Sequence, residues 1–180
     1  MKKILFFLIC FSPLLLVAQS KTTDALQKQF DNSFSMYFYK NTLRMINQTD
    51  NKEFDEMVKN IEKMKFLMID KSKKDFGSTD YKKLKSSYAS ETYEEIMTSR
   101  YEGKNIDIYV KDKKGSALGT VVLVNDSTSL YVLDILGTID IKQASKLFSI
   151  LDGSSEIGQK IKNFMDKGDD HKGKKEIHLD

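Results

Sequence analysis

The stretch that decides the fold runs from residue 105 to residue 137 and reads NIDIYVKDKKGSALGTVVLVNDSTSLYVLDILG. Apolar residues alternate with other residues at its start, which is typical of a half-buried strand: Ile106, Ile108 and Val110. Two further apolar segments follow at residues 121–124 and 130–136, and turns rich in Lys, Gly, Asn, Asp and Ser separate the three. Strands joined by short turns pair in antiparallel fashion. The stretch therefore predicts a three-stranded antiparallel meander.

Upstream of the meander, the sequence predicts a mixture of helices and strands. Residues 21–32 indicate a marginal lead-in helix, and the aromatic run from Phe34 to Tyr39 favours a strand. A helix is expected from an apolar stripe in the 3.6-residue rhythm, with Asp50 and Glu53 spaced as a capping box: Phe54, Met57, Val58, Ile61 and Met64. Residues 66–69 then favour a strand buried on both faces.

Later segments follow the same logic. Tyr81, Leu84 and Tyr88 share a helical face, whereas Tyr93–Tyr101 fits a helix or a strand equally well. After Gly137, a capping-box spacing predicts a helix over residues 140–151, and a shorter one is expected near residues 157–165. We therefore predict one α+β domain over residues 20–165, an antiparallel meander sheet covered by helices, with a polar tail at 166–180. Two small subdomains are the alternative.

The N-terminal segment, residues 1–19, has the pattern of a secretory signal peptide. Lys2 and Lys3 precede an apolar run from residue 4 to residue 17, and Ala18 offers the small residue that a signal peptidase requires. The run is short for a membrane span, so we expect a periplasmic or secreted protein with no stable span. The position of Cys10 inside the apolar run argues against a lipoprotein, since a lipidated cysteine follows such a run.

Cleavage near Ala18 would change the composition of the 180-residue chain. Its single cysteine, Cys10, and its single proline, Pro13, both lie in the signal, so the mature protein could form no disulfide. Loss of Lys2 and Lys3 would lower the net charge from +3 to +1, which gives no electrostatic reason to expect a nucleic-acid partner. Stability must then come from packing alone.

Three segments together carry a family resemblance: Ile108–Lys111, Val121–Asp126 and Val132–Asp140. They resemble a family of small exported bacterial proteins known only as a domain of unknown function, with a Val-Leu-Asp-Ile-x-Gly-x-Ile-Asp signature at residues 132–140. The order of elements from Ser35 to Asp70 is similar as well. The resemblance implies export and this fold, and it carries over no functional residue.

Catalytic chemistry based on histidine or cysteine finds little support. His171 and His178 lie in the polar tail, where they could not be held beside a nucleophile, and a thiol-free body lacks the usual zinc ligands. The sequence contains neither the spacing of a calcium-binding loop nor a glycine-rich phosphate loop. We therefore expect no metal, no cofactor and no catalytic residue.

Three residues are candidate binding residues. Asp134 shares strand parity with Leu130 and Val132 and would be buried with them, which would raise its pKa. We favour the other interpretation, in which Asp134 faces solvent or binds neighbouring backbone, and Leu133 and Ile135 form the buried face with Tyr131. Tyr37 and Tyr39 lie on the face of their strand opposite Phe34, Met36 and Phe38, where they could form an aromatic binding platform.

Three hypotheses for function follow. The first is a non-enzymatic envelope protein that binds an unknown envelope protein or acts as an accessory factor. The second is a carboxylate-dependent hydrolase of cell-wall or polysaccharide substrates, which would need two acids about 5 to 10 Å apart in a cleft. The third is a regulatory partner in envelope stress sensing, which the export signal motivates. Lysines beside an apolar stripe at residues 157–165 could also make a peripheral membrane contact, although docking on the domain is the favoured interpretation.

Overall fold

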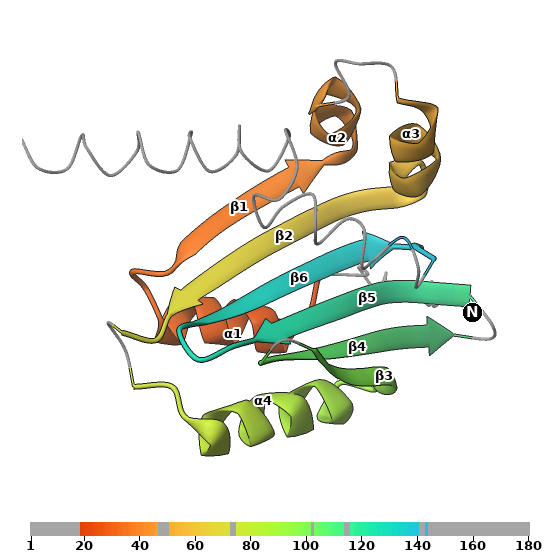
Figure 1. Cartoon of the computed structure of the whole chain (residues 1–180). Coiled ribbons are helices and arrows are strands. Elements are labelled where there is room, and N and C mark those ends of the chain that lie inside the picture. The colour runs from red at the N-terminus through yellow and green to blue at the C-terminus, as the bar shows by residue number, and fades with distance from the viewer. Residues whose placement is uncertain are drawn as a thin grey trace, which may run out of the picture.

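The computed structural model of the chain describes residues 19–46, 51–72, 75–101, 103–113, 116–140 and 143. Its described strands form one six-stranded sheet in the order β1-β2-β6-β5-β4-β3, with antiparallel neighbours throughout. The strands are β1 (Phe34–Tyr39), β2 (Ile61–Asp70), β3 (Glu94–Tyr101), β4 (Lys104–Lys113), β5 (Ser116–Asn125) and β6 (Ser129–Gly137). The predicted meander is thus confirmed as β4-β5-β6, within a single α+β domain (Figure 1).

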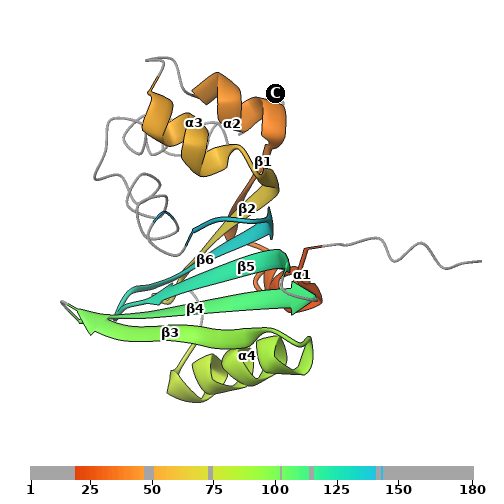
Figure 2. The ribbon, with the colours of Figure 1, turned by 90° about the vertical axis from the view of Figure 1, so that its right-hand side faces the viewer.

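Helices pack against both faces of this sheet. One face carries α1 (Lys21–Gln29) and α4 (Ser78–Ser90), whose buried side chains join one apolar cluster with β2, β5 and β6. The short helices α2 (Lys40–Ile46) and α3 (Lys52–Val58) lie together beyond the ends of β1 and β2, away from α4 (Figures 1 and 2). Their apolar residues belong to a second cluster on the opposite face of the sheet. Both faces of the central strands are therefore buried.

The helix predicted from the stripe between Phe54 and Met64 is shorter than expected. It ends at Val58, and Ile61 and Met64 lie in β2. A register shift between Ile61 and Lys63 inserts an extra residue, so two side chains three positions apart reach the same apolar cluster. The bulge therefore produces a spacing that imitates a helical stripe. The cap also differs, because the Asn51 side chain accepts the backbone N–H groups of Glu53 and Phe54.

The structure also settles the segments on which the sequence was ambiguous. The ambiguous segment after Tyr93 is strand β3, and the lead-in helix at the start of the chain is α1. The strand from Ile106 is not half-buried, because Asp107 and Tyr109 on its second face are buried too. The predicted signal, the helices expected over residues 140–151 and 157–165, and the tail from 166 lie outside the described residues, apart from positions 19, 140 and 143.

Gly137 ends β6 in a conformation that other residues rarely adopt, with φ at +113°. A Cβ at this position would lie 2.2 Å from the carbonyl oxygen of Asn60, which accepts the Thr138 N–H. We expect Gly137→Ala to lower the free energy of unfolding by about 2–3 kcal/mol, measured by urea denaturation. Gly103→Ala is the control, since its φ is +77° but its Cβ would meet nothing within 4 Å. Equal losses in the two variants would contradict a role for the Asn60 contact.

Candidate functional site

A row of paired residues crosses the sheet beneath α1. Tyr37 on β1 pairs with Lys65 on β2, Lys65 pairs with Asp134 on β6, and Asp134 pairs with Val121 on β5. Directly paired residues on antiparallel strands point to the same face, so their side chains form one line across the sheet. The register therefore brings two of the predicted site residues, Tyr37 and Asp134, to the two sides of one lysine.

Asp134 is fully buried, which overturns the favoured interpretation that it faces solvent. That interpretation assumed one buried face, whereas Leu133 and Ile135, the chain neighbours of Asp134, and Val132, which shares its face, are all buried. Its Oδ2 accepts the backbone N–H of Ser20 at 3.0 Å, and its carbonyl oxygen accepts the Gln19 Nε2 at 3.1 Å. Among the described residues, its Oδ1 has no hydrogen-bond partner. The carboxylate thus fixes the segment that leads into α1.

Burial raises the pKa of Asp134 to about 6, because a carboxylate charge is poorly solvated inside the protein. The Thr23 hydroxyl, the Ser20 N–H and the positive charge of Lys65 act in the opposite direction but do not cancel the effect of burial. The Thr23 hydroxyl is itself engaged with the Tyr88 hydroxyl at 2.9 Å. Asp134 is therefore a buried acid that titrates well above its ordinary range.

Lys65 is the buried cation of the row. Its side chain has no exposed surface, and its Nζ lies 2.6 Å from Asp24 Oδ1 on α1 and 5.2 Å from the centre of the Tyr37 ring. Burial lowers the pKa of Lys65, but the hydrogen bonds to Asp24 and Tyr37 outweigh burial, so the pKa is raised overall. The lysine therefore stays charged and ties α1 to the sheet.

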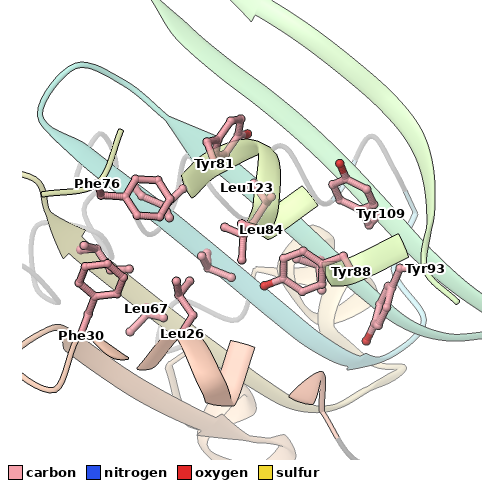
Figure 3. Close-up of a cluster of buried hydrophobic side chains, with 14 residues drawn as sticks. Leu26, Phe30, Leu67, Phe76, Tyr81, Leu84, Tyr88, Tyr93, Tyr109 and Leu123 are labelled. Carbon is pink, nitrogen blue, oxygen red and sulfur yellow. The ribbon is translucent and has the colours of Figure 1, made fainter. Parts of the chain in front are cut away.

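Tyr88 on α4 packs into the apolar cluster between α1, α4 and the sheet, next to Thr23 of α1. Its ring lies between Tyr109, stacked at 5.7 Å between centroids, and Tyr93, edge-on at 5.9 Å (Figure 3). The Tyr88 side chain is fully buried, with a relative solvent exposure of 0%. Burial raises the pKa of Tyr88 well above its ordinary value, so its hydroxyl stays protonated and bonded to Thr23. Tyr88 thus links α4, α1 and the sheet.

Glu91, just after α4, caps the first turn of α1. Its carboxylate accepts the backbone N–H groups of Lys21 and Thr22 and the hydroxyls of Ser20 and Thr22. A negative charge at a helix N-terminus is stabilised by the unpaired amides there. Glu91 and Asp134 together hold the start of α1 from two elements that are distant in sequence.

An open groove of about 570 Å³ runs between α1 and α4. Its lining mixes apolar side chains such as Leu26, Phe76 and Leu84 with two carboxylates, Asp80 and Glu91. Asp80 accepts the Gly77 N–H at the start of α4, and Glu91 caps α1. Both acids of the groove are therefore engaged at helix N-termini.

A second buried acid, Asp107 on β4, has a different environment. It accepts hydrogen bonds from Tyr81, from Lys85 at 2.8 Å and from Thr98 at 2.6 Å. Burial would raise the pKa of Asp107, but these donors outweigh it and lower the pKa below its ordinary value. Lys85 also pairs with Glu95 at 2.9 Å. This network joins α4 to β3 and β4, and its carboxylate is satisfied, unlike that of Asp134.

Tyr37 and Tyr39 lie on β1, the last strand on its side of the described sheet. They are 39% and 56% exposed, and the Nζ of Lys63 lies 4.9 Å and 5.6 Å from their ring centres. The Tyr37 hydroxyl also donates to Gln27 Oε1 on α1 at 3.1 Å. As predicted, the two rings lie on the face opposite Phe38, and we call Tyr37, Tyr39 and Lys63 the edge patch.

Sequence reasoning missed several members of these clusters: Gln19, Ser20, Lys65 and Glu91. A signal for Lys65 was present, since it lies in a buried strand with the parity of Leu67 and Ile69. In the sequence, Gln19 and Ser20 stand out only as the residues that follow the expected cleavage site. Nothing in the sequence near Glu91 indicates that it caps a helix about seventy residues earlier.

Within the part of the chain that the structure describes, no helix has the length and apolarity needed to cross a membrane. No group of three or more potential metal ligands occurs there either.

The structure defines a small α+β domain with one antiparallel sheet. A buried lysine, Lys65, and a buried acid, Asp134, lie side by side on that sheet beneath α1. Residues 28–147 match the family model described as a domain of unknown function, DUF4252, and the chain belongs to this family. No curated protein and no solved structure matches this chain.

Proposed function

We propose that this chain is an exported, non-enzymatic accessory protein that binds another protein of the cell envelope through the edge patch. The signal-like pattern of residues 1–19 supports export. The observation that carries the binding proposal is the pair of exposed tyrosine rings, Tyr37 and Tyr39, ordered around Lys63 on an edge strand.

The chemistry of the edge patch suits a protein partner. Tyrosine offers a large, rigid contact area with a polar tip, and it is enriched among the residues that dominate binding energy at interfaces. An edge strand also presents backbone N–H and C=O groups to which an extended segment can add as a further strand. The partner we propose is therefore an extended protein segment that pairs with β1 and packs against both rings.

The acids of the domain give less support to the hydrolase hypothesis. The two acids of the groove, Asp80 and Glu91, hold helix N-termini, and Asp134 lies beneath α1. A carboxylate that bonds backbone amides is poorly placed to exchange protons with a substrate. We therefore put binding first. A role in envelope stress sensing is a special case of protein binding, and the identity of the partner would distinguish it.

Affinity capture from envelope extracts tests the proposal. The mature protein should recover a specific partner, and Tyr39→Ser should reduce the affinity for it by about tenfold or more. Tyr101→Ser is the matched control, because Tyr101 is 66% exposed on the opposite edge strand β3. Equal effects of the two substitutions would argue against the edge patch.

The mass of the exported form tests export. A species that begins near Gln19 and carries no lipid supports export as proposed, and a lipid on Cys10 contradicts it.

A further inference from the structure

The first residues that the structure describes, Gln19 and Ser20, are both buried. Gln19 is 9% exposed and Ser20 is 1% exposed, and both bind Asp134. The sequence predicts cleavage near Ala18, and we take the bond between Ala18 and Gln19, which directly follows this small residue, as the site. Cleavage would therefore create a new chain end beside a buried carboxylate.

We propose that removal of the export signal creates the missing partner of Asp134, because the new α-ammonium group of Gln19 pairs with this carboxylate and locks α1 onto the sheet. The inference rests on the proposed export. A signal peptidase hydrolyses the Ala18–Gln19 peptide bond: the C–N bond breaks, one water is added, and Ala18 keeps a carboxylate. The former amide nitrogen of Gln19 becomes a protonated amine, since α-amino groups have a pKa near 8.

Covalent geometry places this ammonium close to Asp134. Three bonds separate the backbone nitrogens of Gln19 and Ser20, so they lie at most about 4 Å apart. The Ser20 nitrogen is 3.0 Å from Asp134 Oδ2. The ammonium would then lie within about 7 Å of that oxygen, on a carboxylate whose Oδ1 has no partner among the described residues. Opposite charges at such a separation interact strongly when water is excluded.

The charged and titratable groups around Asp134 leave this place open. Lys65, its neighbour on β2, is paired with Asp24 of α1. Glu91 is occupied by the first turn of α1, and Tyr88 and Tyr93 stay protonated because burial raises their pKa values. Asp24 adds a second negative charge that raises the pKa of Asp134. A new cation at Gln19 would relieve this excess of negative charge.

The family match adds a second argument. It begins at residue 28, so the anchoring segment from Gln19 to Gln27 precedes it, while Lys65, Tyr88 and Asp134 lie inside it. The part of the chain that matches the family thus contains the carboxylate of Asp134, and the segment next to the cleavage site contains the ammonium group of Gln19 that would pair with it. A chain that still carries its signal would bury an acid without this ammonium, and it would fold less stably until cleavage.

Two purified chains test this inference. One begins at Gln19 with a free amine, verified by mass, and the other carries Gly-Ser before Gln19. The Asp134 carboxyl pKa, measured by carbon NMR titration, should be near 6 in the extended chain and lower by about one unit or more in the chain with the free amine. The thermal midpoint at pH 7 should be several degrees higher with the free amine. Equal pKa values in the two chains would overturn the proposal.

Further variants separate charge from length. In an Asp134→Asn background, the difference in thermal midpoint between the two chains should disappear. If this variant does not fold, the chain acetylated at Gln19 provides the test. This form lacks the positive charge but keeps the Gln19 Nε2 bond to Asp134, so it should behave like the extended chain; behaviour like that of the free amine would contradict pairing. Because purified chains are compared, a negative result leaves export and partner binding untouched, and an uncleaved cellular form would instead contradict the proposed export.

Discussion

Tyr88→Ala is expected to lower the free energy of unfolding by about 3–5 kcal/mol, the range found when a buried aromatic side chain is truncated. Three contributions add to this loss. The ring is fully buried, it stacks on Tyr109 and meets Tyr93 edge-on, and its hydroxyl bonds Thr23 on α1. Truncation would leave a cavity where α1, α4 and the sheet meet (Figure 3). Urea denaturation followed by circular dichroism measures the effect.

Tyr88→Phe separates the ring from its hydroxyl. This variant keeps the packing and loses only the bond to Thr23, so it should cost about 1 kcal/mol. Tyr101→Ala is the surface control, because Tyr101 is 66% exposed and should change stability by less than about 0.5 kcal/mol. A loss in Tyr88→Phe as large as that in Tyr88→Ala would show that the hydroxyl, rather than the buried ring, dominates.

The second large effect is a pH dependence that Asp134 imposes on the chain extended before Gln19. Its pKa is about 6 in the folded protein and near 3.8 when unfolded. Below pH 3.8 the group is protonated in both states and costs nothing. Between these values the unfolded chain releases its proton first, so stability falls as pH rises, and above pH 6 the loss is complete. The shift corresponds to about 3 kcal/mol.

Asp134→Asn isolates this contribution, because its side chain cannot ionise but its oxygen can still accept the Ser20 N–H. The difference in unfolding free energy between the extended parent chain and this variant should change by about 2.4 kcal/mol between pH 4 and pH 7, in favour of the variant at pH 7. Urea denaturation at several pH values gives this difference. A constant difference would mean that Asp134 titrates normally in the folded protein.

Local pattern was enough where one segment and its immediate neighbour decide the structure. The alternation around Ile108 and the short polar turns predicted the meander, and the aromatic run predicted β1 with its limits, Phe34 and Tyr39. It failed where pairing inserted an irregularity. The bulge near Ile61 places side chains three residues apart on one face, and periodicity alone assigns such a spacing to a helix.

The candidate site was less accessible to sequence reasoning. The positions of Tyr37 and Tyr39 on one strand face followed from alternation, since successive side chains on a strand point to opposite faces. The burial of Asp134 did not, because alternation indicates which residues share a face but not whether helices cover both faces. Its partner Ser20 is more than one hundred residues away in the chain.

By itself, the sequence determined the α+β class, the antiparallel meander and the signal-like N-terminus, because these depend on the order of residues within short segments. Only the tertiary structure decided that Lys65 and Asp134 are neighbours beneath α1, and that Glu91 caps this helix. The physical reason is that strand order and register set contacts between distant segments. Once helices exclude water from such a contact, the pKa values of its charged groups shift, and the stability of the domain changes with them.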